Sequence, residues 1–285
     1  MERIVVGVDQ SPAGRQALDW AVRECLARGA GLTAVRAWQT PVFGFYYAIE
    51  PAISDGPPLA QTEAQRVADE ELKLALERVP GGEGLDARAI AVMGPAAQVL
   101  VDAAQDTSMV VVGSRGLGAL SRAVLGSVSS SVLHHAGCPV AVVPEVAEAP
   151  QVEPPRVLVG IDHSPASRAA LRYAVEHARR HAAVLVPVFV HEPVVAGAGP
   201  DLRELEGGER GSLLATAAAA GANDMVVEPE VCTGHAGEVL NRLARPQDVL
   251  VTGSRGRGGF TGLLLGSTST SIAQHATCPV VVVRN

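Results

Sequence analysis

The segment Val110-Val111-Val112-Gly113-Ser114-Arg115-Gly116 is followed, after nine residues, by the pair Gly126-Ser127. An apolar run stops at a glycine, a glycine-rich loop follows, and the Gly-Ser pair opens a segment with helical spacing. Glycines let backbone N–H groups converge on an anion without hindrance from a Cβ, and the start of a helix favours negative charge. The stretch therefore predicts a strand, an anion-binding loop and a helix, in that order.

The same stretch occurs a second time, as Leu250-Val251-Thr252-Gly253-Ser254-Arg255-Gly256 followed after nine residues by Gly266-Ser267. The opening segments of the two copies, residues 3–12 and 156–165, also match, at a spacing of 153 positions. The two loops lie only 140 positions apart, so the second copy is 13 residues shorter in its middle. Repeats of this length indicate tandem domains, because solenoid repeats run about 20–50 residues.

The boundaries of these two domains follow from the repeat. We predict one domain at 1–145 and a second at 156–285. The linker at 146–155 is rich in proline, glutamate and alanine, which is typical of a short and fairly stiff connection.

The composition limits the function. The chain of 285 residues has a net charge of −7 and no dense block of basic residues, so nucleic-acid and acidic-membrane binding are disfavoured. Lys73 is the only lysine, which excludes a lysine that grips phosphate in the glycine loop. The four cysteines form no CxxC pair, and we interpret them as structural. With no signal region and no apolar run of about 18 residues, we expect a cytoplasmic protein without membrane spans.

Apolar strands alternate with helical patterns along each copy. In the first copy we predict strands at 3–8, 32–38, 87–92, 110–112 and 139–143, and helices at 11–28, 61–79, 95–106 and 127–136. Uninterrupted apolar strands indicate a parallel sheet covered on both faces. The predicted fold class is α/β, with two tandem doubly wound domains, each with a five-stranded sheet in the order 3-2-1-4-5.

Two features of the second copy depart from this regular pattern. Pro187 falls inside the second strand, which predicts an edge or bulged position. Three glycines lie between 205 and 211, which predicts a helix that begins late or is broken before Ser212.

In a doubly wound sheet, ligands bind beyond the C-terminal ends of the strands, where the strand order reverses. The order 3-2-1-4-5 puts that point between strands one and four. Asp9 and Gly113 follow or end these strands, so two separate features point to the same place.

This arrangement resembles the universal stress protein family in its ATP-binding, tandem-domain form. The motif is Gly-x-x-Gly, nine residues and Gly-Ser, together with the early Val-Gly-Val-Asp-x-Ser and the closing Cys-Pro-Val at 138–140 and 278–280. The resemblance covers nearly the whole chain. It implies ATP as the ligand, with or without magnesium, at up to two sites per chain.

The resemblance also implies a role for each matching residue. Asp9 and Asp162 would accept hydrogen bonds from the ribose, Gly7 and Gly160 would let the ligand approach, and Ala37 and Val190 would lie beside adenine. The residues implied to surround the phosphates are Gly113, Ser114, Arg115, Gly116, Leu117, Gly118, Gly126, Ser127 and Val128 in the first copy and Gly253, Ser254, Arg255, Gly256, Arg257, Gly258, Gly266, Ser267 and Thr268 in the second.

Simpler interpretations exist for some of these residues. An aspartate after a strand is often a helix cap, and an arginine in a loop is often only solvated. The aromatic segment 43–47 would either cover the nucleotide or pack against a partner.

Three alternative functions are compatible with these residues. The first is a stress-response regulatory protein that binds ATP and is not an enzyme. The second is a weak ATPase or nucleotidyl-transferring enzyme in which Asp9 holds magnesium or orients water. The third is an assembly module that binds nothing. The apolar last strands further predict a pseudo-dimer of the two copies within the chain, and a homodimer of chains.

Overall fold

The computed structural model describes residues 2–39, 59–116, 125–146, 154–192, 202–256 and 265–284, with backbone alone at 202–205. The chain separates into two compact units, Met1–Val143 and Pro144–Asn285. The aromatic segment 43–47 lies outside the described residues, as do Leu117, Gly118, Arg257 and Gly258.

The first domain contains a sheet of five parallel strands in the order β3-β2-β1-β4-β5. This is the predicted order. The strands are β1 (Arg3–Gly7), β2 (Gly31–Trp38), β3 (Ala87–Met93), β4 (Met109–Gly113) and β5 (Val140–Val143).

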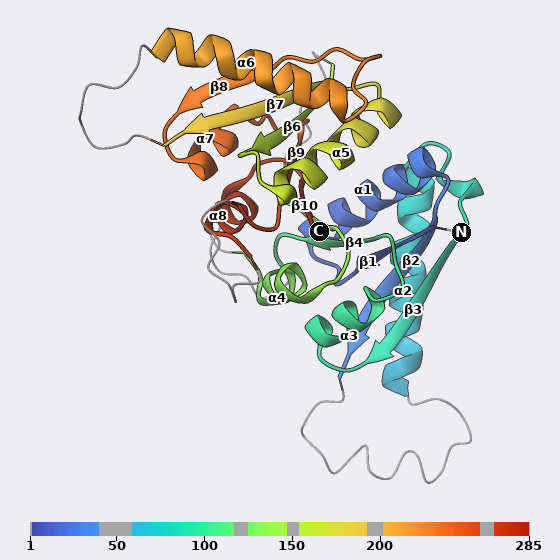
Figure 1. Ribbon diagram of the computed structural model, residues 1–285. Coiled ribbons are helices and arrows are strands. Elements are labelled where there is room, and N and C mark those ends of the chain that lie inside the picture. The colour runs from blue at the N-terminus through green and yellow to red at the C-terminus, as the bar shows by residue number, and fades with distance from the viewer. Residues whose placement is uncertain are drawn as a thin grey trace. The chain divides into compact units, whose positions relative to one another are not determined.

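Helices cover this sheet, with α1 beside α2 and α3 beside α4 (Figure 1). They are α1 (Pro12–Arg28), α2 (Leu59–Arg78), α3 (Ala96–Ala103) and α4 (Ser127–His135), with a short 3₁₀ helix η2 (Gly82–Gly84). Helix α1 begins where predicted, because the Ser11 side chain accepts a hydrogen bond from the Gly14 N–H and Pro12 occupies the first turn. It ends at Gly29, whose φ of 64° closes the helix in the left-handed region.

The core of the first domain is aliphatic, in keeping with a chain in which aromatic residues make up only 3%. Its largest fully buried side chains are Ile4, Leu18, Leu32, Met109 and Leu133. Cys25 belongs to the same core, and burial raises the pKa of its thiol to about 12. That thiol stays protonated at neutral pH, so Cys25 packs as a small apolar residue.

The second domain repeats the fold, with its parallel strands in the order β8-β7-β6-β9-β10. Its strands are β6 (Arg156–Ile161), β7 (Val184–His191), β8 (Glu230–Thr233), β9 (Val249–Gly253) and β10 (Val280–Val283). Its helices are α5 (Pro165–Arg180), α6 (Leu202–Ala219), α7 (Ala236–Leu243) and α8 (Ser267–His275).

Pro187 lies in β7, which is not an edge strand, since β6 and β8 flank it. The pairing with β8 is interrupted beside it: an isolated bridge joins Leu185 to Val227, and the ladder resumes at Val188 and Glu230. The register is unchanged across the interruption, which puts Pro187 opposite Pro229. Pro187 has no N–H to donate, so an inner strand accommodates it at a gap in the ladder.

The prediction of a late or broken second helix in this domain is wrong, because α6 is continuous through Gly207, Gly208 and Gly211. Packing outweighs the weak helix propensity of glycine here. Leu213 and Ala217 are buried, and α6 packs on β7 and β8. The three glycines face solvent, where they cost helix stability without leaving a gap in the core.

Gly208→Ala is therefore expected to raise the free energy of unfolding by about 1 kcal/mol, the difference between the two residues in an exposed helix. A Cβ at Gly208 would meet no atom within 4 Å. Urea unfolding measures the change. As a control, Gly221→Ala should lower stability, because Gly221 has a φ of 98°. A loss of stability in Gly208→Ala would contradict a continuous α6.

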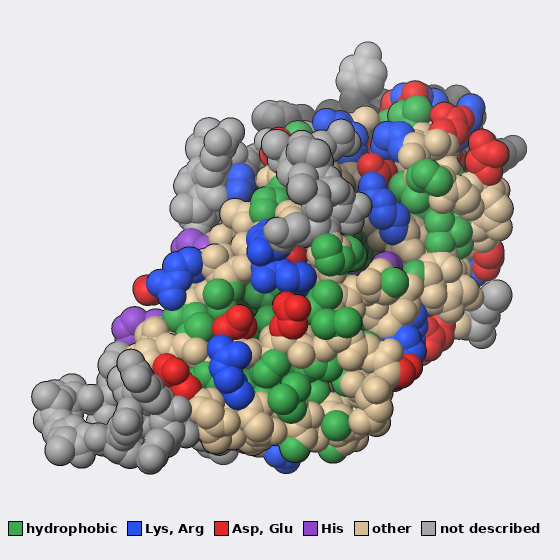
Figure 2. Space-filling view, turned by 90° about the horizontal axis from the view of Figure 1, so that it is seen from above, with side chains coloured by type: hydrophobic (Ala, Val, Ile, Leu, Met, Phe, Trp, Pro, Cys, Tyr) green, Lys and Arg blue, Asp and Glu red, His purple; other side chains and the backbone are tan. Residues whose placement is uncertain are grey.

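Charged side chains of both signs lie interspersed on the face shown in Figure 2, with no field of one sign. None of the described helices combines the length and apolar character that a membrane span requires.

Candidate functional site

A cavity of about 410 Å³ lies in the first domain at the C-terminal ends of β1 and β4. The sheet order reverses there, so the cavity is where a doubly wound sheet is expected to bind its ligand. Nine of the residues predicted for this site line it: Gly7, Asp9, Ala37, Gly113, Arg115, Gly116, Gly126, Ser127 and Val128.

Other lining residues were not predicted. They are Val8, Gly14, Val35, Ala96, Leu100, Val112 and Ser129. Most are apolar, and with Ala37 they give the cavity an apolar wall beside the glycine loop. Val35 could have been found from Ala37, since residues two apart in a strand share a face. Ala96 and Leu100 come from α3, which carries no sequence signal for a ligand.

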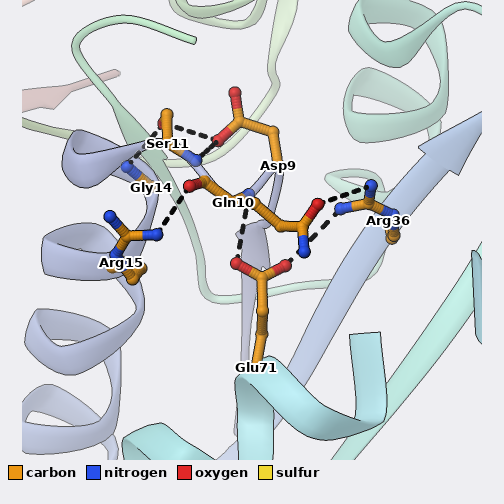
Figure 3. A network of polar contacts seen from close by, with 7 residues as sticks. All are labelled: Asp9, Gln10, Ser11, Gly14, Arg15, Arg36 and Glu71. Atoms are coloured by element: carbon orange, nitrogen blue, oxygen red, sulfur yellow. Dashed lines mark hydrogen bonds and ion pairs between the residues drawn. The ribbon is translucent and has the colours of Figure 1, made fainter. Parts of the chain in front are cut away.

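Asp9 is held in a tight turn between β1 and α1. Its Oδ1 accepts hydrogen bonds from the Ser11 N–H at 3.0 Å and the Ser11 hydroxyl at 2.6 Å. Gln10, between them, has a φ of 65°, which reverses the chain. Figure 3 shows the other oxygen of Asp9 pointing away from these contacts. Ser11, not Asp9, caps α1, and among the described contacts the second oxygen of Asp9 accepts no hydrogen bond.

Gly116 lies directly against that second oxygen. A Cβ built at Gly116 would be 2.6 Å from Asp9 Oδ2, closer than any side chain can approach. Glycine is therefore required for the loop after β4 to meet the carboxylate. The two features that the sequence placed at one point, Asp9 and the glycine loop, are in direct proximity.

A second layer of polar groups supports the Asp9 turn (Figure 3). Glu71 of α2 accepts the Gln10 N–H at 3.1 Å, and its other oxygen lies 3.5 Å from Nη1 of Arg36. Burial raises the pKa of the Glu71 carboxyl above its ordinary value, and the Arg36 guanidinium only partly offsets this. Glu71 thus holds the backbone that orients Asp9, and its charge is costly to bury.

The raised pKa of Glu71 gives a pH prediction. The folded chain holds the Glu71 proton more tightly than the unfolded chain, so the stability advantage of wild type over Glu71→Gln falls as pH rises above about 4.5. The glutamine oxygen can still accept the Gln10 N–H. Urea unfolding of both proteins from acidic to neutral pH tests this, with the exposed Glu70→Gln as control. A difference between wild type and Glu71→Gln that does not change with pH would contradict it.

Helix α4 begins at the cavity. Gly126 precedes it and, among the described residues, no side chain caps its first N–H groups. The N–H groups of Ser127 and Val128 therefore remain available to an anion, and the helix dipole adds to their attraction. The Ser129 hydroxyl donates to the Gly113 carbonyl at 2.6 Å, which fixes the start of α4 to the end of β4.

Ser114 was predicted beside the ligand, but it does not line the cavity. Its side chain is buried, and its backbone anchors the loop. The Ser114 N–H donates to the Val143 carbonyl at 2.7 Å, and its carbonyl accepts the Gly126 N–H at 2.8 Å. Ser254 makes the same two bonds in the second domain, with Val283 and Gly266. Both serines shape the loop through their backbone.

The second domain repeats the geometry. The Ser164 N–H donates to Asp162 Oδ1 at 2.9 Å, and His163 between them has a φ of 62°. A Cβ at Gly256 would lie 2.7 Å from Asp162 Oδ2. The predicted Gly266 lies against Arg255 and Gly256, while Ser267 and Thr268 open α8. Gly160 packs on Leu240, as Gly7 packs on Leu100, and Val190 lies near the end of β7.

The fold and the site together define a tandem pair of doubly wound α/β domains, each with an aspartate and a glycine loop at the switch point of its sheet. The model of the universal stress protein family matches residues 1–144 and 154–284. The chain therefore belongs to the universal stress protein family.

Individual relatives agree with this family. A universal stress protein of Mycolicibacterium smegmatis is 36% identical over 293 residues, covering 99% of this chain and 96% of its own. One from Mycobacterium tuberculosis is 34% identical over 303 residues, covering 99% and 94%. The crystal structure of a universal stress protein from Archaeoglobus fulgidus has the same fold, with a TM-score of 0.66 at 22% identity over 99% and 96% of the chains.

Proposed function

We propose that this protein binds ATP at up to two sites per chain and serves as a stress-response regulator. The observation that carries the proposal is the composition of the first-domain cavity. One carboxylate, Asp9, stands between a glycine loop with an open helix start and an apolar wall. A nucleotide needs these three surfaces together, for its sugar, its phosphates and its base.

Each surface suits one part of ATP. The second oxygen of Asp9 can accept hydrogen bonds, which matches ribose hydroxyls and would repel a phosphate. The N–H groups of the glycine loop and of Ser127 and Val128 suit phosphate oxygens. The apolar wall at Val35 and Ala37 suits adenine. Magnesium would be held mainly by the phosphates, since Asp9 is the single carboxylate among the described lining residues.

The residues that line the cavity favour binding of ATP without its hydrolysis. The described lining residues include neither a histidine nor a cysteine, and no second carboxylate to activate water. We expect negligible ATP hydrolysis by the purified protein. Hydrolysis that disappears in Asp9→Asn would instead support the enzyme hypothesis, with Asp9 orienting water or magnesium.

Titration with ATP, adenosine and inorganic triphosphate tests the assignment of the three surfaces. We expect ATP to bind more tightly than either fragment, because only ATP contacts the apolar wall, Asp9 and the loop at once. Triphosphate binding as tightly as ATP would reduce the site to a simple anion site. If none of the three compounds binds, the proposal of nucleotide binding is contradicted, and the hypothesis of an assembly module without a ligand remains.

The proposal of a regulatory role rests on family membership. The proposal of an association between domains and between chains rests on the last strand of each domain. We propose that the two domains associate through β5 and β10 and that chains form a homodimer. The support is the sequence of these strands, in which every residue is apolar. Light scattering that showed only monomer would contradict the homodimer.

A further inference from the structure

We infer that the two nucleotide sites are unequal, and that Ser167 and Val190 narrow the second-domain site so that ATP binds more tightly to the first. This inference rests on the proposed function. It concerns two positions at which the repeated sites differ, Gly14 against Ser167 and Ala37 against Val190.

Gly14 and Ser167 occupy the same place in their domains. Each is the third residue after the serine that caps the first helix, and each donates its N–H to that serine's hydroxyl, at 3.0 Å in the first domain and 3.1 Å in the second. Their surroundings can therefore be compared atom by atom.

Gly14 lines the first-domain cavity, and the missing side chain is what leaves room there. A Cβ at Gly14 would lie 2.5 Å from Asp9 Oδ1, so it would displace the carboxylate. Ser167 has that Cβ and a hydroxyl as well. The hydroxyl donates to the Ser164 carbonyl at 3.0 Å, and the residue is 4% exposed, so the side chain is fixed in place. The second domain thus carries a fixed side chain at the position where the first domain has none.

Ala37 and Val190 form the second difference. Ala37 lines the first-domain cavity from the end of β2. Val190 lies at the matching position of β7, in register with Cys232 of β8, and adds two methyl groups on the side proposed for adenine. A fixed aromatic base cannot move aside in a slot between strand and helix, so the added volume weakens its fit.

Several contacts that shape the two sites are alike. Leu100 packs on the glycine that ends the first strand of its domain, and Leu240 does the same in the second domain. A Cβ built at Gly116 would lie 2.6 Å from the aspartate Oδ2 of its domain, and one built at Gly256 would lie 2.7 Å from the matching oxygen. The serine hydroxyls of Ser129 and Ser269 bind the fourth-strand carbonyls at 2.6 and 2.7 Å. Ser167 and Val190 thus differ from their counterparts within a shared frame of contacts, while the phosphate residues also differ at Val128 against Thr268 and, outside the described residues, at Leu117 against Arg257.

Full-length chains with one working site test the inference. Asp162→Asn leaves the first site, and Asp9→Asn leaves the second. We expect ATP to bind the Asp162→Asn chain about tenfold more tightly than the Asp9→Asn chain, by calorimetric titration. Equal affinities would overturn the inference while leaving the proposed function intact. Absence of ATP binding in wild type would instead overturn the proposed function.

Exchange of the side chains completes the test. In the Asp9→Asn background, Ser167→Gly with Val190→Ala should recover most of the tenfold difference. Ser167→Ala is the matched control, because it keeps the Cβ and should change the affinity little. In the Asp162→Asn background, Ala37→Val should weaken binding without touching the cap of α1. Unchanged affinity in the Ser167→Gly, Val190→Ala chain would overturn the inference.

Discussion

Asp9→Asn is expected to weaken ATP binding at the first-domain site on the order of 100-fold. The proposed ribose contacts are two hydrogen bonds to a charged acceptor, each contributing about 1.5–3 kcal/mol. Asparagine can keep its oxygen toward the Ser11 N–H, but it then turns an amide donor toward the hydroxyls. Titration of the Asp162→Asn chain, with and without Asp9→Asn, measures the loss at one site.

The exposed Asp102→Asn provides the control, since Asp102 lies on α3 outside the cavity and accepts only from Gln98 among the described contacts. It should leave ATP affinity unchanged. The free energy of unfolding in urea should also differ little between Asp9→Asn and wild type, because the asparagine oxygen can still accept the Ser11 N–H in the turn at Gln10. Unchanged ATP affinity in Asp9→Asn would contradict the role of the carboxylate and leave Asp9 as part of a turn.

Gly113→Ala is expected to lower the free energy of unfolding by about 1–3 kcal/mol, the usual cost of overpacking. A Cβ at Gly113 would lie 2.8 Å from the Ala13 carbonyl carbon and 2.9 Å from the Gly14 nitrogen. These are backbone atoms of α1, which cannot rotate away as a flexible side chain would. The same shift would move α1 and the Asp9 turn, so ATP binding should weaken as well.

Gly137→Ala is the matched control for Gly113→Ala. Gly137 is exposed, and a Cβ there would meet no atom within 4 Å. Urea unfolding of both variants separates crowding from a general effect of removing a glycine. Gly253→Ala should repeat the loss in the second domain, where the Cβ would lie 2.8 Å from Ala166. Equal stability of the Gly113 and Gly137 variants would show that α1 can move away from β4.

Much of the fold was predictable because the sequence contains two copies of the same pattern of strands, loops and helices. Ser11 and Pro12 mark the start of α1, so this boundary could be placed from local chemistry. Asp9 and Gly113 could be brought together because the strand order of a doubly wound sheet fixes where its C-terminal ends meet.

Other features depended on tertiary contacts that no local pattern contains. Ser114 is predicted beside the ligand, but the sequence gives no sign of its backbone bonds to Val143 and Gly126, which anchor the loop. Leu100 joins the cavity only because α3 packs against Gly7. The glycines of α6 predicted a break, yet the burial of Leu213 in the packed helix outweighs their propensity.

The most direct measurement is the number of ATP molecules bound per chain at saturation, by equilibrium dialysis of the full-length protein. Two sites predict two ATP per wild-type chain at saturation, with binding about 100-fold weaker at one site in Asp9→Asn and in Asp162→Asn, and at both sites in the double variant. A wild-type chain that binds no ATP, or a double variant that binds two ATP as tightly as wild type, would contradict nucleotide binding at the two aspartate and glycine-loop sites.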